Sequence, residues 1–271
     1  METQENSFVT PAWPEWLENC RCPDELFAEA YDTLPDSFRA ALKTAIAAAF
    51  FHFGQNDATT GARLENPSKG FRRHSTSCPA PWALTIFDEN FHAPARLMAA
   101  CVLPALCGVP LLGACCLGKN PAPENLLALE LCGVEDTFCV DDKLVQVLIS
   151  EMGKGRIMLL HGGDWSGIAH AAAVFNLPCM AEQAPPRLFV ANPEAFDLDV
   201  LAMAQGTNRA ALTTRPEGRI DALYLENPAS PDPEFGEHSP LTLGPGLEAF
   251  WLWADLAQDF FRVRHLAFDT I

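Results

Sequence analysis

The chain has 271 residues, of which 49% are hydrophobic and 20% are charged. This composition excludes an intrinsically disordered chain, because it supplies enough apolar surface for the core of one or two domains. The net charge of −17, from 35 acidic and 18 basic residues, argues against nucleic acids and anionic membrane surfaces as partners, since both would repel the protein.

The amino-terminal sequence METQENSFVTPAWPEW has neither the basic nor the apolar region of a secretory signal, and no apolar run is long enough to cross a bilayer. We therefore expect a soluble, cytoplasmic protein. The ten cysteines lie mostly within apolar runs, such as Cys115 and Cys116 in GACCLG. This placement predicts buried, reduced thiols rather than disulfides or a zinc site.

Residues 1–33 are rich in proline, tryptophan and acids without a clear period, so we expect an arm that lies across the body or across a partner. After the capping residue Asp36, apolar residues recur at helical spacing, which predicts an amphipathic helix. These residues are Phe38, Leu42, Ala45, Ile46 and Ala49. Residues 56–81 are polar and rich in turn formers, which predicts a loop or linker.

From residue 82 onward, apolar strands alternate with helices of ten to fifteen residues, a pattern typical of a parallel sheet covered on both faces. The predicted strands are 82–87, 109–117, 134–140 and 155–163, and the helices between them are 94–108, 123–133 and 143–153. His161, at the end of the last of these strands, is expected to be a capping or hydrogen-bonding residue. The fold class is therefore α/β, with a doubly wound, Rossmann-like sheet.

A second, shorter run of elements follows. It has predicted helices at 168–175 and 197–206, strands at 186–192 and 210–214, one candidate strand within 215–238, a helix at 247–257 and a last strand within 260–268. The aromatic residues Phe250, Trp251 and Trp253 are expected in the core or in a dimer contact. We expect three regions: an arm and helix at 1–75, a first Rossmann-like domain at 76–180 and a shortened second α/β region at 181–271.

The order and the residue patterns of these segments over residues 38–271 resemble histidinol dehydrogenase, a family with an aldehyde dehydrogenase-like fold. WALTIFDENFHAPARLMAACVLPALCGV is similar to the family's first nucleotide-fold strand, loop and helix, ALELCGVEDTFCV to its Leu-Ala-Gly-Val-Asp-Glu segment, and HSPLTLG to its Ser-Pro turn. Family members are dimers in which terminal segments reach across to the partner. The resemblance therefore implies a shortened, divergent member of this family that forms a homodimer.

The family oxidises an alcohol to a carboxylate with NAD and zinc, and the resemblance implies that this chain has lost the zinc ligands. Gln205 matches the glutamine of the family's Gln-x-x-His pair, but Asn208 stands at the histidine position and Pro245 at the position of a ligating aspartate. The family's last histidine has no counterpart before Ile271. We expect no bound metal.

The family's acid–base pair and NAD loops are also changed. Glu237-His238 is too close to the Ser-Pro turn for the family's Glu-His position, so we expect an exposed loop pair and no catalytic residue. The phosphate-binding loop after the first strand is matched by Thr85 to Glu89, which ends in two acids, and another NAD segment by Asp141-Asp142. Neither segment suits a pyrophosphate.

Gly162, Gly163 and Asp164 match the family's Gly-Pro-Gly-Asn loop, so we interpret them as a vestigial cofactor-binding loop. We expect no cofactor. A ligand pocket is expected at Thr85, Gln205 and Asn208, at the carboxyl ends of the strands. Side chains such as Phe87 and Arg187 could fill this groove.

Three hypotheses about function follow. The favoured one is a catalytically degenerate, histidinol dehydrogenase-like protein with a binding or assembly role, which is not an enzyme. The second is an NAD(P)-dependent oxidoreductase with altered, zinc-independent chemistry. The third is a sensor of a small cationic molecule, built from acids expected at strand ends: Asp88, Glu89, Asp141, Asp142 and Asp164.

Overall fold

A five-stranded parallel sheet forms the centre of the computed structural model, which describes residues 11–229 and 239–270. Its strand order is β5-β4-β3-β6-β7. The strands are β3 (Trp82–Asp88), β4 (Leu111–Leu117), β5 (Asp136–Val140), β6 (Arg156–Leu159) and β7 (Cys179–Ala181). The expected α/β fold with a doubly wound parallel sheet is thus confirmed.

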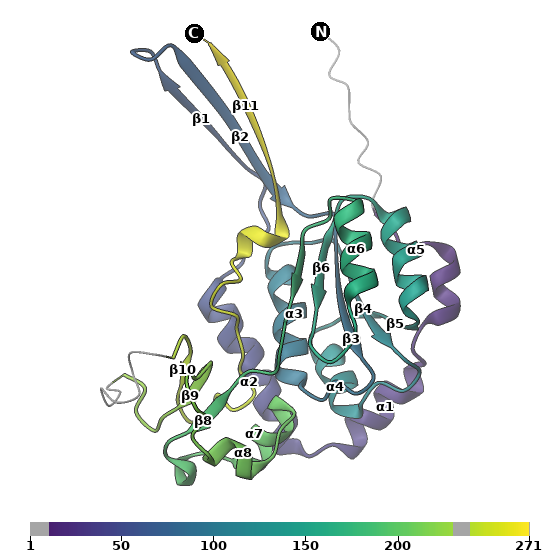
Figure 1. Ribbon diagram of the computed structural model, residues 1–271, viewed down its shortest axis with the longest axis vertical. Coiled ribbons are helices and arrows are strands. Elements are labelled where there is room, and N and C mark those ends of the chain that lie inside the picture. Colours follow the sequence, from purple (N-terminus) through teal and green to yellow (C-terminus); the bar gives the residue numbers. More distant parts are fainter. Residues whose placement is uncertain (1–10, 230–238, 271) are drawn as a thin grey trace.

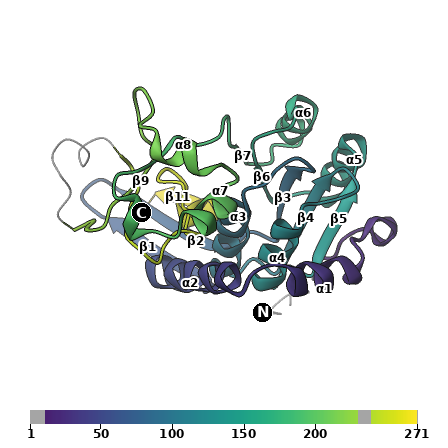
Figure 2. The same cartoon turned by 90° about the horizontal axis from the view of Figure 1, so that it is seen from below.

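Helices cover both faces of this sheet (Figures 1 and 2). They are α3 (Pro94–Leu106), α4 (Pro123–Leu131), α5 (Asp142–Met152) and α6 (Ser166–Val174). Because side chains alternate along a strand, Leu84 and Ile86 pack with α5 and α6, whereas Ala83 and Phe87 pack with α3. Both faces of β3 are buried, which explains why its sequence reads as a continuous apolar run.

A smaller parallel sheet of order β10-β9-β8 lies beside the first. Its elements are β8 (Leu188–Val190), η2 (Pro193–Ala195), α7 (Leu198–Gln205), α8 (Arg209–Thr213), β9 (Ala222–Tyr224) and β10 (Thr242–Leu243). The long helix α2 (Asp36–Phe53) buries Phe38, Leu42 and Ala45 in the cluster that also contains Ala95 of α3 and Leu201 of α7. Helices α2 and α3 therefore join the two sheets.

The described part of the amino-terminal arm lies across the body. It contains η1 (Glu15–Cys20) and α1 (Asp24–Thr33). Trp13 Nε1 donates a hydrogen bond to Asp136 at 2.8 Å, and α1 packs on α4. The expectation that this arm covers the body holds for residues 11–33, whereas residues 1–10 lie outside the described residues.

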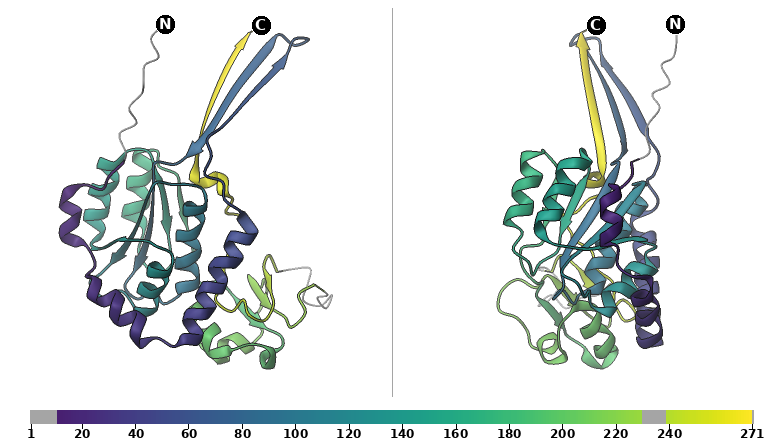
Figure 3. Two further views of the ribbon diagram at one scale, coloured as in Figure 1. Left: turned by 180° about the vertical axis from the view of Figure 1, so that it is seen from behind. Right: turned by 90° about the vertical axis from the view of Figure 1, so that its right-hand side faces the viewer.

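A third sheet projects away from the body (Figures 1 and 3). It consists of β1 (Thr60–Asn66), β2 (Phe71–Pro79) and β11 (Arg262–Thr270), all antiparallel, and η3 (Gln258–Phe261) precedes β11. The expectation of a loop at 56–81 is therefore wrong. The turn formers at 66–70 make only a hairpin turn, in which Asn66 Oδ1 accepts hydrogen bonds from Ser68 and Lys69.

Two further expectations from the sequence are wrong. Residues 209–213 form helix α8 instead of a strand, because the Asn208 side chain caps the backbone N–H of Ala211. Residues 247–257 form turns and irregular backbone instead of a helix. Within this segment the carbonyls of Glu248 and Phe250 accept hydrogen bonds from Gln205, and tertiary contacts bury its apolar side chains.

Other expectations fare better. Phe250 and Trp251 lie in the core, and all ten cysteines are free thiols, as expected. None of the helices among the described residues combines the length and apolar composition that a membrane span requires. Residue 75 lies within β2 and residue 180 within β7, and the three-region division remains a prediction.

Gly206, which ends α7, allows a close backbone contact with His92, which precedes α3. Its φ of +65° is left-handed, and a Cβ atom there would lie 2.3 Å from the carbonyl oxygen of His92. We expect Gly206→Ala to lower the free energy of unfolding in urea by about 3 kcal/mol or more, because conformational strain and a backbone clash add.

Gly133→Ala is the matched control for this variant. Gly133 has a φ of +69° at the end of α4, where the N–H of Val134 donates to the Leu129 carbonyl as in a left-handed helix cap. Nothing lies within 4 Å of the added Cβ atom, so only the conformational cost of about 1 kcal/mol is expected. Equal losses in the two variants would contradict the importance of the close contact.

Candidate functional site: a buried Arg–Glu–His cluster beside a pocket

The strand order of the main sheet reverses between β3 and β6, since the chain adds β4 and β5 on one side and β7 on the other. In open α/β sheets, ligands bind outside the carboxyl ends of the strands at such a point. Three polar residues gather there: Arg96 of α3, which follows β3, His161 after β6 and Glu182 after β7. This edge of the sheet is therefore the candidate site.

Glu182 is the centre of this cluster. Its Oε2 accepts a hydrogen bond from His161 Nδ1 at 2.7 Å, and its Oε1 accepts from Arg96 Nη1 and from Trp253 Nε1, each at 3.3 Å. His161 Nδ1 also lies 3.2 Å from Arg96 Nη1. Because the contact to the carboxylate is shorter, we assign the proton to Nδ1, which leaves Nε2 of the ring without a partner among the described residues.

The charges of this cluster are buried, so they depend on each other. Arg96 is 2% exposed, and burial lowers its pKa against the opposing effect of Glu182. Burial also raises the pKa of Glu182, but the hydrogen bond from His161 and the charge of Arg96 outweigh it and hold that pKa below its ordinary value. Glu182 is thus a carboxylate at neutral pH. Arg96 Nε is buried and has no hydrogen-bond partner among the described residues.

A pocket of about 300 Å³ opens beside Arg96 and His161. Arg187 and Gln205 also line it, with Thr207 and a wall of apolar residues. That wall consists of Pro185, Pro186, Leu188, Ala211, Leu212 and Pro216. Phe87 does not reach this pocket, because it lies in the core beneath the sheet. Arg187 does line the pocket, and its Nε lies 3.6 Å from Asp221 Oδ2.

The residues matched to the family's zinc ligands have structural roles. Gln205 Nε2 donates to the Tyr224 hydroxyl at 3.2 Å and to two backbone carbonyls at 3.4 Å, while Asn208 Oδ1 caps α8. Among the described residues, no group of three or more His, Cys, Asp or Glu side chains is arranged to hold a metal ion. The donor set at Gln205, Asn208 and Pro245 therefore does not fit zinc.

The segments matched to the family's NAD loops also fit a dinucleotide poorly. Asp164 Oδ1 accepts from the backbone N–H of Ser166 at 3.0 Å, and Asp141 Oδ1 accepts from that of Leu144 at 2.8 Å. These N–H groups begin α6 and α5, where a phosphate would bind, so the chain's own carboxylates occupy that position. A Cβ atom on Gly163 would meet Trp165, which lies over this loop, whereas Gly162 has open space around its Cα.

The remaining residues expected at the site are dispersed. Thr85 is buried and accepts a weak hydrogen bond from the Cys101 thiol, so it does not line the pocket. Asp88 accepts from the backbone of Asn90, and Glu89 from that of Lys119. Four of the five acids expected at strand ends thus accept hydrogen bonds from backbone groups, and Asp142 accepts one from the Gln146 side chain. Glu237-His238 lies outside the described residues.

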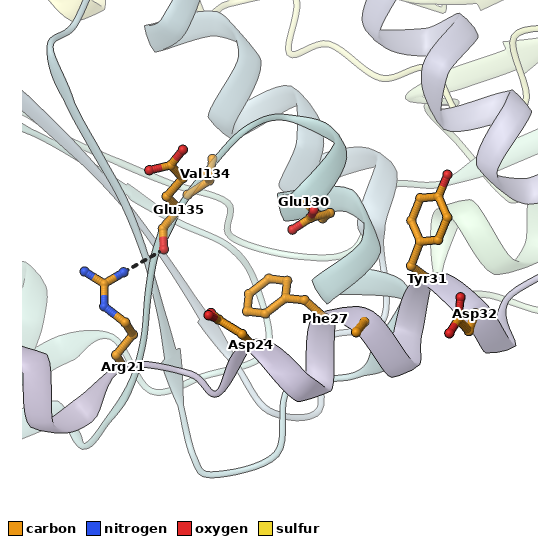
Figure 4. Close-up of a pocket in the computed structure, with 9 residues that line it drawn as sticks. Arg21, Asp24, Phe27, Tyr31, Asp32, Glu130, Val134 and Glu135 are labelled. Atoms are coloured by element: carbon orange, nitrogen blue, oxygen red, sulfur yellow. Dashed lines mark hydrogen bonds between the residues drawn. The ribbon is translucent and has the colours of Figure 1, made fainter.

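A larger hollow of about 800 Å³ lies between α1 and the end of α4, beside the start of β5 (Figure 4). Phe27 and Tyr31 of α1 line it together with several carboxylates, and Arg21 donates to the backbone carbonyl of Glu135. It lies away from the carboxyl ends of the strands. None of its lining side chains is both buried and unpartnered among the described residues.

Arg96 and Glu182 were not singled out from the sequence. Arg96 is the one charged residue within PARLMAACVLPAL, an otherwise apolar helix, and this isolation is the signal that could have found it. Lysine and arginine are almost never fully buried unless they are paired. Glu182 follows a three-residue strand in a turn-like sequence, and nothing local marks it.

No protein-family model and no curated protein matches the sequence. Among solved structures, histidinol dehydrogenase from Elizabethkingia anophelis is similar with a TM-score of 0.56 at 12% identity, over 93% of this chain and 77% of that one. Succinate-semialdehyde dehydrogenase from Burkholderia pseudomallei has a TM-score of 0.39 at 18% identity, over 69% and 39%. The likeness to the first shows that this chain has a histidinol dehydrogenase-like fold, and at 12% identity it shows the fold alone.

We expect Glu182→Gln to lower the free energy of unfolding by about 3–5 kcal/mol at pH 7, because it leaves the buried Arg96 charge without its counterion. Since the pKa of Glu182 is lowered in the folded state, its contribution is present above the unfolded value and is lost as the pH falls through the folded one. The variant should therefore lose less stability than the wild type when the pH falls below about 4.

Glu124→Gln provides the control, because Glu124 accepts from His92 Nδ1 at 2.8 Å in a pair whose histidine is exposed. Its loss should stay within about 1 kcal/mol. Chemical unfolding of both variants at pH 3 to 7 measures the difference, and similar losses in the two would show that the Glu182 cluster does not stabilise the fold.

Proposed function

We propose that this protein is a catalytically degenerate relative of histidinol dehydrogenase that binds a small molecule in the pocket beside Arg96, His161, Arg187 and Gln205. The observation that carries this proposal is the arrangement at Gln205. Its amide nitrogen donates to internal acceptors, its Oε1 is buried without a partner among the described residues, and the residue lines a pocket that remains open. The site has lost the donors of the family's zinc chemistry but keeps a concave surface with polar groups.

The size of the pocket supports a small ligand over a dinucleotide. A volume of about 300 Å³ lies at the lower end of the range for ligand pockets. The acids that cap α5 and α6 would also repel a pyrophosphate at the helix ends. We therefore favour a binding role that uses neither NAD nor zinc.

One observation favours the alternative, an oxidoreductase with altered, zinc-independent chemistry. Glu182 orients His161 through Nδ1 and leaves Nε2 free, which is the arrangement of a general base with its orienting carboxylate. This pair of residues can transfer a proton but cannot accept a hydride, so an oxidoreductase would also need a bound cofactor. A test of cofactor binding therefore distinguishes the binding protein from the oxidoreductase.

A ligand that binds the folded state stabilises it by mass action and raises the melting temperature. Because we propose that the protein binds neither zinc nor a nicotinamide cofactor, we expect no shift with zinc, NAD, NADP or NADH. The measurement is a thermal shift at millimolar nucleotide and micromolar zinc, with a histidinol dehydrogenase as the positive control. A shift of several degrees with a nucleotide would support the oxidoreductase, and His161→Asn should then abolish turnover while nucleotide binding persists.

We also propose that the protein is a homodimer whose contacts include the projecting sheet of β1, β2 and β11. The register of this sheet places its exposed apolar side chains on one face, where a partner can cover them. Rows pair Leu64 with Arg73 and Phe268, and Asn66 with Phe71 and Thr270, so the exposed apolar residues of the three strands share one face. An exposed sheet with an apolar face is a marginal structure in water without a partner.

The charge of the projecting sheet favours a second copy of this chain as the partner. Its three strands and their turn carry six basic side chains against two acids, Glu65 and Asp269, within a chain of net charge −17. The basic residues are Arg63, Lys69, Arg72, Arg73, Arg262 and Arg264. A basic arm on an acidic body is complementary to the body of another copy.

The double variant Leu266→Asp/Phe268→Asp should convert the dimer to a monomer, since it places charge on the apolar face. His265→Asp/Ala267→Asp adds the same number of carboxylates on the opposite face and should leave the dimer intact. Sedimentation equilibrium measures both. A monomeric wild type, or dissociation by both double variants, would contradict the proposed contact.

A further inference from the structure

We propose that the ligand of the pocket is a small organic acid, with its carboxylate on Arg96 and Arg187 and its apolar body on the proline and leucine wall. This inference rests on the proposed function, because it assumes that the pocket is a ligand site, and it names the chemical class that the site selects.

The lining of the pocket is basic. Of the described residues that line it, two are arginines and one is a histidine, and none is an aspartate or glutamate. The carboxylate partners of the two arginines, Glu182 and Asp221, do not line the pocket, so its lining is basic within a chain that has almost twice as many acidic as basic residues. Arg96 and Arg187 come from α3 and from the segment before β8, which are far apart in the sequence. An anionic group is the natural ligand of such a lining.

Arg96 has hydrogen-bonding capacity that the protein does not use. Only its Nη1 is bonded to Glu182, while its Nε is buried without a partner among the described residues. A buried donor without an acceptor is unfavourable, and the planar guanidinium fork can bind a carboxylate through two parallel hydrogen bonds. Because Arg96 lines the pocket, a ligand carboxylate that reaches this side of the guanidinium would satisfy a group that the protein leaves unsatisfied.

The other groups of the pocket suit an apolar ligand body that carries one hydrogen-bond donor. Gln205 Oε1 is a buried acceptor without a partner among the described residues, so it would accept a hydrogen bond from a hydroxyl or N–H group. The wall of three prolines, two leucines and an alanine is apolar and offers little for a second charge. Together these features select a short, branched or cyclic acid with a hydroxyl group over inorganic phosphate or a polyanion.

The test uses the full chain and four probes: 2-hydroxyisovalerate, isovalerate, isovaleramide and inorganic phosphate. Isothermal titration gives the affinities, and the NMR signal of the Trp253 indole N–H, which donates to Glu182, reports binding beside the cluster. We expect 2-hydroxyisovalerate to bind most tightly, isovalerate more weakly, and isovaleramide and phosphate at least about tenfold more weakly than the hydroxy acid.

Two exposed arginines supply a matched pair of variants, because both interact with Asp221 but only Arg187 lines the pocket. Arg187→Gln should weaken binding of the acids about tenfold, whereas Arg219→Gln should leave it unchanged. The Arg187 and Arg219 side chains are 47% and 60% exposed, so neither variant should prevent folding. Equal melting temperatures of the two variants would verify this.

The results distinguish an error in the proposed ligand class from an error in the proposed ligand-binding function. If isovaleramide binds as tightly as isovalerate, or if Arg187→Gln has no effect on acid binding, the acid class is wrong while the pocket remains a ligand site. If phosphate binds as tightly as the hydroxy acid, the apolar part of the assignment is wrong. If no probe binds, the acid class is overturned, and a screen of neutral and cationic fragments on the Trp253 signal then decides the proposed function.

Discussion

The buried carboxylate of Glu182 is the interaction on which the carboxyl edge of the main sheet depends. It joins α3 through Arg96, the end of β6 through His161, and the irregular segment 247–257 through Trp253. A buried ion pair contributes little net stability by itself, but removal of one partner is costly because the other charge then remains buried alone. The cluster therefore fixes the relative positions of three segments, and the pocket lies against it.

Much of the fold could be predicted because both faces of the main sheet are covered. Strands such as β3 and β4 are continuous apolar runs, and the helices between them begin with Pro94 or Pro123 or end near Gly133. Residues 247–257 could not be predicted in this way. Their apolar residues have helical spacing, but burial against the second sheet and the hydrogen bonds from Gln205 hold the backbone in another form.

The projecting sheet shows a second limit of local patterns. Residues 60–66 and 71–79 are rich in polar residues, and their apolar members appear as a face only when the register with β11 is known, almost two hundred residues later. The residues of the candidate site are likewise brought together only by contacts between distant segments. Gln205 and Asn208 were found through a resemblance, whereas Arg96 and Glu182 belong together only because β3 and β7 lie on either side of β6. Long-range register carries information that single segments lack.

The distribution of charge links the changed site residues to the proposed ligand. Carboxylates of Asp141 and Asp164 each accept from a backbone N–H at the start of the helices that follow β5 and β6, and their negative charge disfavours a phosphate there. At the same edge of the sheet, Arg96 and Arg187 carry positive charge in the lining of the pocket, which is small and has an apolar wall. In the proposed site, attraction for an anion would come from these two guanidinium groups and not from the helix ends. This arrangement underlies the proposal of a compact acid with one charge in place of an extended cofactor with several.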